Sequence, residues 1–90
     1  MSLDETNRAV YRGQNLILLT QREFALLSVF IKNPGNILTR EYLISQVWDE
    51  KVSNNIVDVY IRYLRNKIDE EGQIGYIQTV RGIGYIMPES

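Results

Sequence analysis

The chain has 90 residues, of which 44% are hydrophobic, and its ten basic and eleven acidic side chains give a formal net charge of −1. This length and composition predict one ordered domain over residues 1–90. Cysteine and histidine are both absent, which excludes disulfides and removes the commonest general base and metal ligand. We therefore expect neither an enzyme nor a bound metal or cofactor. The near-neutral charge argues against a protein that binds nucleic acid without sequence preference.

The N-terminal part of the chain is predicted to form short strands. Ala9 to Tyr11 and Leu16 to Leu19 have strand composition, and Arg12-Gly13-Gln14 forms a turn between them. Met1 to Leu3 are left out of the fold prediction, as a candidate remnant of expression. The sequence has no apolar stretch long enough to cross a bilayer and no secretory signal at its start, so we expect a cytoplasmic protein without a membrane partner.

Two helices are predicted to follow. Thr20 and Glu23 have the spacing of a capping box, in which each side chain bonds the backbone N–H of the other residue. Apolar residues then recur at helical spacing until Asn33-Pro34-Gly35-Asn36 ends the helix after Lys32. Thr39 begins a second helix of about nine residues. Its apolar side consists of Leu43, Ile44, Val47 and Trp48.

A third helix is predicted over residues 54–68, with Ser53 or Asn54 as its cap. At 100° per residue, its apolar side chains fall within about 60° of Val57 and form a core stripe. That stripe consists of Val57, Tyr60, Ile61, Leu64 and Ile68. The opposite face consists of Asn55, Val59, Arg62, Tyr63 and Asn66. Asp58 and Arg62 lie four residues apart, and we expect them to pair.

Charge is separated along this helix. Residues 51–67 hold four basic side chains (Lys51, Arg62, Arg65, Lys67) and one acidic side chain (Asp58), which gives a local charge of +3. The run Asp69-Glu70-Glu71 follows at once and cancels it. We interpret this run as a solvated helix end and not as a metal site, because the sequence offers no further ligands beside it.

The second and third helices together predict a helix-turn-helix. A helix that exposes arginine, asparagine and a small apolar residue on one face suits the major groove, where arginine donates to guanine and asparagine pairs with adenine. The predicted base contacts are the five residues of that face: Asn55, Val59, Arg62, Tyr63 and Asn66. The alternative is an ordinary amphipathic helix with a solvated outer face, and the pattern alone leaves both open.

A hairpin is predicted at the C-terminal end. Tyr76 to Val80 and Tyr85 to Met87 read as strands, and residues 81–84 (RGIG) join them. Glycine permits a narrow loop, and an arginine at the tip suits the negative potential of a minor groove. We therefore predict minor-groove contacts from Arg81 and Gly82. The alternative is a surface arginine beside a turn, and a nucleotide-binding loop is rejected because no helix follows the glycines.

Six further residues are candidates for contacts to the DNA backbone: Thr39, Arg40, Trp48, Tyr60, Arg65 and Thr79. Two of them have competing interpretations. A lone tryptophan beside an apolar residue is more typical of the core, so Trp48 is assigned there first. Arg65 lies at the side of the exposed face, where a structural ion pair is an equal alternative.

Two motifs give the chain a family resemblance. Residues 57–68 (VDVYIRYLRNKI) and 78–85 (QTVRGIGY) strongly resemble the effector domain of OmpR/PhoB-type response regulators, most of all members from Gram-positive bacteria. Residues 19–24 with 26–27, and 38–41 with 43–48, match the same family in the same order. The resemblance extends from Asn7 to Met87.

The resemblance implies an α+β winged helix-turn-helix fold with a four-stranded N-terminal antiparallel sheet, three helices and a C-terminal β-hairpin wing. It implies a two-component transcription regulator that binds double-stranded promoter DNA, with residues 54–68 in the major groove and the wing, residues 81–84, in the minor groove. Two copies are expected side by side on direct repeats, in association with the nucleoid. It also implies a receiver domain, absent from this chain, through which a sensor kinase acts.

Two departures from the family pattern bear on function. Asn55 and Tyr63 stand where well-studied members often carry arginine, so we expect weak and salt-dependent binding by the isolated domain. The connection from Trp48 to Val57 is about two residues shorter than usual, and in some activators this loop contacts RNA polymerase. Activation and repression therefore both stay open.

Two other functions are weighed against DNA binding. A winged-helix module that binds proteins is favoured by the near-neutral charge and disfavoured by Arg62 together with Arg81. An enzyme that works with carboxylates alone is disfavoured by the missing histidine and cysteine and by the lack of a paired acidic motif.

Overall fold

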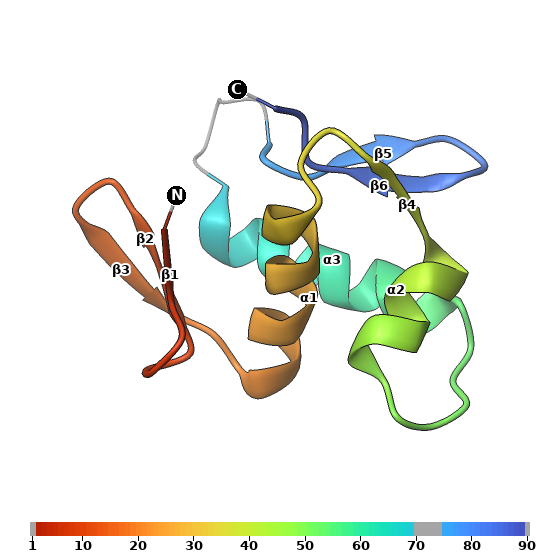
Figure 1. The fold of residues 1–90 in the computed structure, drawn as a ribbon, viewed down its shortest axis with the longest axis horizontal. Helices are drawn as coiled ribbons and strands as arrows, with labels where there is room; N and C mark the ends of the chain where they lie inside the picture. The colour runs from red at the N-terminus through yellow and green to blue at the C-terminus, as the bar shows by residue number, and fades with distance from the viewer. Residues whose placement is uncertain (1, 70–74, 90) are drawn as a thin grey trace.

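The helices form a layer between two small antiparallel sheets in the computed structural model, which describes residues 2–69 and 75–89 (Figure 1). The elements follow in the order β1 (Ser2–Asp4), β2 (Ala9–Arg12), β3 (Asn15–Leu18), α1 (Gln21–Lys32), β4 (Ile37–Thr39), α2 (Arg40–Val47), α3 (Asn55–Ile68), β5 (Gln78–Val80) and β6 (Gly84–Ile86). This is the predicted winged helix-turn-helix order of a sheet, helices and a C-terminal hairpin.

The N-terminal sheet contains β1, β2 and β3 in that order. Ser2 and Leu3, which the fold prediction left out, are part of this sheet. Ser2 pairs with Tyr11, and Leu3 pairs with Val10 and packs against the core. The described residues give this sheet three strands and not the four that the family resemblance implied.

Helix α1 begins and ends where the sequence predicted. The Thr20 N–H donates to Glu23 Oε1 at 2.9 Å, and the Glu23 N–H donates to Thr20 Oγ1 at 3.2 Å. The capping box is therefore confirmed. Asn33 forms the C-cap and donates its backbone N–H to the Phe30 carbonyl. Thr39 caps α2 in a similar way, because its hydroxyl accepts from the Tyr42 N–H at 3.1 Å.

The C-terminal sheet contains a strand that the sequence analysis missed. Its order is β4-β6-β5, so β4 pairs with β6 across a long stretch of chain. Gly84 lies where these strands approach most closely, since a Cβ atom there would stand 2.1 Å from the Leu38 carbonyl oxygen. Gly84 therefore permits sheet packing and not the narrow loop to which it was assigned. Gly82, with φ of +75°, is the glycine that the turn requires.

The core lies between the helices and is closed by both sheets. The buried side chains are Val10, Leu19, Leu26, Leu27, Phe30, Leu38, Leu43, Trp48, Val57, Ile61, Leu64, Ile68, Ile77 and Tyr85. The predicted core stripe of α3 is confirmed for four of its five members, while Tyr60 is half-buried at its border. In the part of the chain that the structure describes, no helix is both long and apolar enough to span a membrane.

Candidate nucleic-acid interface

The predicted reading face of α3 is open to solvent. Asn55, Arg62, Tyr63 and Asn66 are exposed, and Val59 is half-buried among them. Within residues 2–69 and 75–89, the structure gives Arg62 no hydrogen bond or ion pair. The face therefore exposes a cation, two amides and an aromatic ring to solvent.

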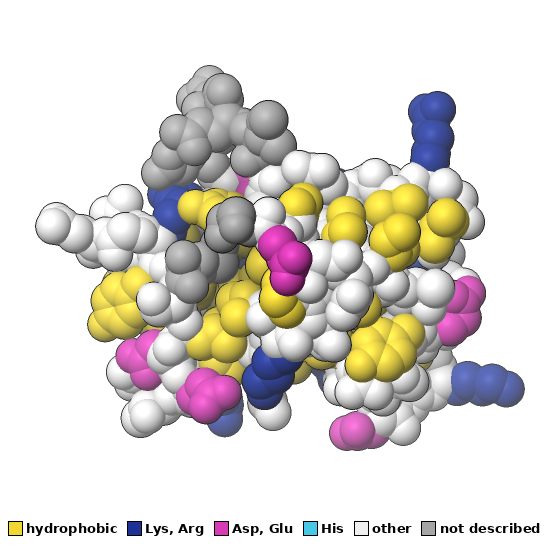
Figure 2. All heavy atoms as spheres, turned by 45° about the horizontal axis from the view of Figure 1, so that its top comes forward, with side chains coloured by type: hydrophobic (Ala, Val, Ile, Leu, Met, Phe, Trp, Pro, Cys, Tyr) yellow, Lys and Arg dark blue, Asp and Glu magenta, His cyan; other side chains and the backbone are white. Residues whose placement is uncertain are grey.

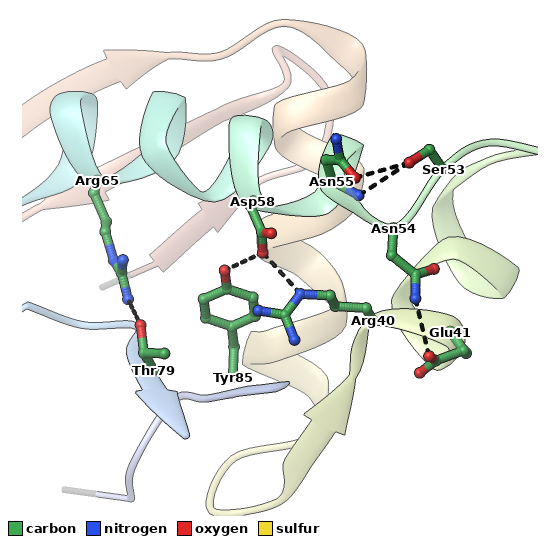
Figure 3. A network of polar contacts seen from close by, with 9 residues as sticks. All are labelled: Arg40, Glu41, Ser53, Asn54, Asn55, Asp58, Arg65, Thr79 and Tyr85. Atoms are coloured by element: carbon green, nitrogen blue, oxygen red, sulfur yellow. Dashed lines mark hydrogen bonds and ion pairs between the residues drawn. The ribbon is translucent and has the colours of Figure 1, made fainter. Parts of the chain in front are cut away.

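Of the two residues predicted to cap α3, Ser53 bonds the start of the helix with its side chain and Asn54 does not. Asn54 makes no capping hydrogen bond; its side-chain amide instead donates to Glu41 Oε1 of α2 at 3.0 Å. The Ser53 hydroxyl accepts from the Asn55 backbone N–H at 3.4 Å and donates to Asn55 Oδ1 at 2.9 Å (Figure 3). Ser53 thus orients Asn55, the first residue of the reading face.

Asp58 makes no hydrogen bond or close ion pair with Arg62, its predicted partner, although attraction by Arg62 also lowers the pKa of Asp58. Its Oδ1 atom accepts a hydrogen bond from the Tyr85 hydroxyl of β6 and another from Arg40 Nε at 2.9 Å (Figure 3). Partial burial opposes ionisation of Asp58, but the hydrogen bonds from Tyr85 and Arg40 outweigh it and lower the pKa of this carboxyl. Burial and the contact with Asp58 raise the pKa of Tyr85. The carboxylate and the phenol are thereby fixed in their charged and neutral forms.

Arg65 is bound within the protein. Its guanidinium donates to the Ile77 carbonyl at 3.2 and 3.0 Å and to Thr79 Oγ1 at 2.9 Å. It also lies 5.6 Å from the centre of the Tyr85 ring. Arg65 was expected to form either a DNA backbone contact or a structural ion pair, and this geometry favours a structural role. Its partners are a carbonyl and a hydroxyl, however, and not a carboxylate. Two candidates for DNA backbone contacts, Arg65 and Thr79, thus bind each other.

Trp48 is in the core, as its first interpretation predicted, with 7% of its surface exposed. The Trp48 ring packs edge-on against the Tyr60 ring, with 5.4 Å between the ring centres, and the Tyr60 ring packs in the same way against Tyr63 at the same distance. The Arg22 guanidinium lies 5.3 Å from the Trp48 ring centre and donates to the Val47 carbonyl at 2.8 Å. This aromatic row supports Tyr63, the exposed ring on the reading face.

The other edge of α3 is fixed to α1. Lys67 Nζ donates to Glu23 Oε1 at 2.5 Å, and the Glu23 side chain is only 4% exposed. Burial opposes ionisation of Glu23, but hydrogen bonds from Lys67 and Thr20 outweigh it and lower the pKa of this carboxyl. Lys67, which contributed to the predicted positive charge of α3, is therefore neutralised within the protein.

The wing exposes its tip. Arg81, Gly82 and Ile83 are all exposed between β5 and β6, and the Ile83 N–H closes the turn onto the Val80 carbonyl at 3.0 Å. No hydrogen bond or ion pair of Arg81 occurs among the described residues, so its guanidinium is available to a ligand.

Figure 2 shows a face of the molecule where acidic, basic and apolar side chains are interspersed, without a continuous basic patch.

The structure also bears on the predicted acidic run and on metals. Asp69 is the C-cap of α3, and its Oδ1 accepts from the Tyr76 N–H at 3.3 Å. Glu70, Glu71 and the predicted turn at Gly72 lie outside the described residues. Within residues 2–69 and 75–89, no three acidic, cysteine or histidine side chains gather to form a metal site.

Sequence reasoning missed two residues that shape this interface. Asp58 was assigned to a local pair, and Tyr85 was given no role. One signal was present in the sequence, because Asp58 is the only acidic residue among the four basic ones of residues 51–67. The partners themselves lie 18 and 27 residues away in sequence, beyond the range of helical periodicity.

Comparison with known proteins agrees with this geometry. Residues 13–87 match a family described as "Transcriptional regulatory protein, C terminal". The response regulator MprA of Mycobacterium leprae is 45% identical over 92 residues, which cover 100% of this chain and 40% of MprA. The chain thus spans about two fifths of the length of this curated relative.

Solved structures give the same fold. The DNA-binding domain of the response regulator AdeR, in complex with an intercistronic region, matches with a TM-score of 0.87 at 28% identity, over 99% of this chain and 94% of that one. DrrB of Thermotoga maritima, an OmpR/PhoB homologue, matches with a TM-score of 0.83 at 32% identity, over 97% of this chain and 41% of that one.

Proposed function

Because the chain belongs to the family of C-terminal, DNA-binding domains of transcriptional regulators, of the OmpR/PhoB response-regulator type, we propose that it reads promoter DNA with α3 and the wing. The exposed face of α3 enters the major groove, and Arg81 with Gly82 enters the flanking minor groove. This family consists of DNA-binding domains and not of enzymes, in agreement with the missing histidine and cysteine.

The observation that carries the proposal is the contrast in how the arginines are used. Arg62 projects from the middle of an exposed helical face, while the neighbouring Arg65 is bound to Ile77 and Thr79. A guanidinium that makes no hydrogen bond or ion pair within residues 2–69 and 75–89, on such a face, suits bidentate donation to guanine. Asn55 and Asn66 beside it offer donor and acceptor pairs for adenine, and Val59 offers a small apolar contact for a thymine methyl.

Contacts to the DNA backbone are proposed from the flanks of this face. Arg40 is the strongest of the six candidates, because Asp58 occupies only its Nε and leaves other N–H groups of the guanidinium for a phosphate. Thr39 and Tyr60 lie on the same flanks. Trp48, Arg65 and Thr79 are the weakest candidates, since each is buried or bound within the protein.

The full-length protein is proposed to have further partners. A receiver domain joined to this one would be phosphorylated by a sensor kinase, and two copies would bind direct repeats side by side. The segment between α2 and α3, residues 48–54, is the part of the domain proposed to meet RNA polymerase. On promoters the protein would be associated with the nucleoid.

Selection of binding sites from random duplex DNA tests the proposal. We expect enrichment of a short motif, with affinity that falls steeply as salt concentration rises. A motif repeated in direct orientation would support binding by two copies. A folded domain that enriches no sequence would contradict DNA reading and favour the alternative of a protein-binding module.

A further inference from the structure

Asp58 is an anion at an unfavourable place for a DNA-binding surface. Counted at 100° per residue from Val57, it lies at about 100°, between the core stripe and Arg62 on the reading face. Its side chain is 41% exposed. A carboxylate at the border of such a face repels phosphates, so its removal would ordinarily strengthen DNA binding.

The contacts of Asp58 join three elements. Asp58 is on α3, and it accepts hydrogen bonds from Arg40, the first residue of α2, and from Tyr85 of β6. Strand β6 belongs to the C-terminal sheet, here called the wing sheet. The Tyr85 ring is 5% exposed and is flanked by two guanidiniums, with Arg40 at 5.3 Å and Arg65 at 5.6 Å from its centre (Figure 3). One carboxylate thus links the reading helix, the preceding helix and the wing.

From this geometry we propose that Asp58 is a positioning residue for DNA binding, which holds Arg40 in place for a phosphate and, through Tyr85, fixes the wing sheet against α3. The inference rests on the proposed function, because it assumes that α3 and the wing meet DNA together.

The mechanism follows from the donors of arginine. A guanidinium has five N–H groups, and the bond to Asp58 uses the one on Nε. The stack on Tyr85 restricts the remaining rotation of the Arg40 side chain. Arg40 therefore needs to lose less conformational freedom when a phosphate binds its other nitrogens. A wing held at a fixed distance from α3 confers the same advantage on Arg81.

The test asks whether removal of the negative charge of Asp58 weakens DNA binding instead of strengthening it. For the motif recovered by site selection, Asp58→Asn is expected to bind about three- to tenfold more weakly, although it removes a negative charge. The slope of log affinity against log salt should become shallower by about 0.9, the loss of one phosphate contact. The matched control Asp49→Asn removes the same charge from an exposed residue between α2 and α3, and it should bind equally or more tightly.

Two further variants separate positioning from a loss of folding. Tyr85→Phe keeps the stacked ring and removes only the hydroxyl, so it should weaken specific binding about threefold while the domain stays folded. In an Arg40→Ala background, Asp58→Asn should weaken binding less than it does in the wild type, and by no more than Tyr85→Phe does, because only the contact with the Tyr85 hydroxyl is left to lose. Each affinity measurement is accompanied by thermal unfolding and by a titration that gives the fraction of protein molecules able to bind DNA. A folding defect lowers this fraction but leaves the slope of log affinity against log salt unchanged.

The outcomes are distinct from those of the proposed function. Wild-type protein that selects no DNA sequence contradicts the function itself. Wild-type protein that binds its motif while Asp58→Asn binds it more tightly, or with an unchanged salt slope, overturns the role of Asp58 and leaves DNA reading intact.

Discussion

The exposed face of α3 and the edge of α3 beside the wing each carry an arginine, but the two side chains differ in their contacts with the rest of the protein. Arg62 on the face has no hydrogen bond or ion pair within residues 2–69 and 75–89. Arg65 on the edge is bound to Ile77, Thr79 and the Tyr85 ring. A single helix therefore has one side that fixes its position and another that is left for a partner.

This difference changes how the charge of the helix is interpreted. The sequence places a charge of +3 on residues 51–67. Glu23 neutralises Lys67, and Arg65 is bound to a carbonyl and a hydroxyl inside the protein. Local net charge thus overstates how many cationic groups of α3 are left for a partner.

The largest effect on stability is expected for Arg65→Ala. Truncation removes hydrogen bonds from a guanidinium to the Ile77 carbonyl and to Thr79, so the free energy of unfolding should fall by about 1.5–3 kcal/mol. Urea unfolding followed by circular dichroism measures this change. A loss below about 0.5 kcal/mol, the usual range for surface substitutions, would remove the distinction between the edge and the face.

Arg62→Ala is expected to affect DNA binding and to leave stability almost unchanged. Its free energy of unfolding should stay within about 0.5 kcal/mol of wild type, because the exposed side chain makes no hydrogen bond or ion pair with the described residues. The free energy of binding to the selected motif should weaken by about 1–3 kcal/mol. Fluorescence anisotropy with labelled duplex DNA checks the affinity, and a variant that unfolds more easily but binds normally would reverse the assignment.

Arg81→Ala in the wing should have a smaller effect. We expect a loss of about 1 kcal/mol for a motif flanked by A·T pairs, where the narrow minor groove has the most negative potential, and less for G·C flanks. Affinity for two duplexes that differ only in these flanks measures it. An equal loss on both duplexes would point to a phosphate contact instead.

The edge of α3 that binds α1 should respond to acid. The folded-state pKa of Glu23 is lowered below its ordinary value of 4.5, so the stability it contributes is fully present above that value and is lost as the pH falls through the folded-state pKa. Urea unfolding between neutral and acidic pH measures the loss. Glu23→Gln should be less stable at neutral pH and should show a weaker dependence on pH; an unaltered dependence would contradict the assignment.

The parts that sequence predicted well depend on near neighbours. Thr20 and Glu23 are three residues apart and fixed the start of α1, and the periodicity of α3 separated its buried stripe from its exposed face. The parts that it missed depend on distant partners. Strand β4 has only three residues and is stabilised by β6, so its own composition carries little signal.

Asp58 illustrates the same limit at the candidate site. Helical spacing offered Arg62 as its partner, four residues away, but folding brings Arg40 and Tyr85 to its carboxylate. Gly84 was assigned to the loop for its flexibility, while the close approach of Leu38 explains it. In both cases the residue type was informative, and the physical reason became visible only with the packing of β4, β6 and α3.

The claim that the exposed face of α3 reads bases is tested most directly by Arg62→Ala against every single-base-pair variant of the selected motif. The account predicts that discrimination disappears at one base pair, by about 1–3 kcal/mol, and persists at the others. Uniform weakening across all variants, with discrimination unchanged everywhere, would contradict it and assign Arg62 to the DNA backbone.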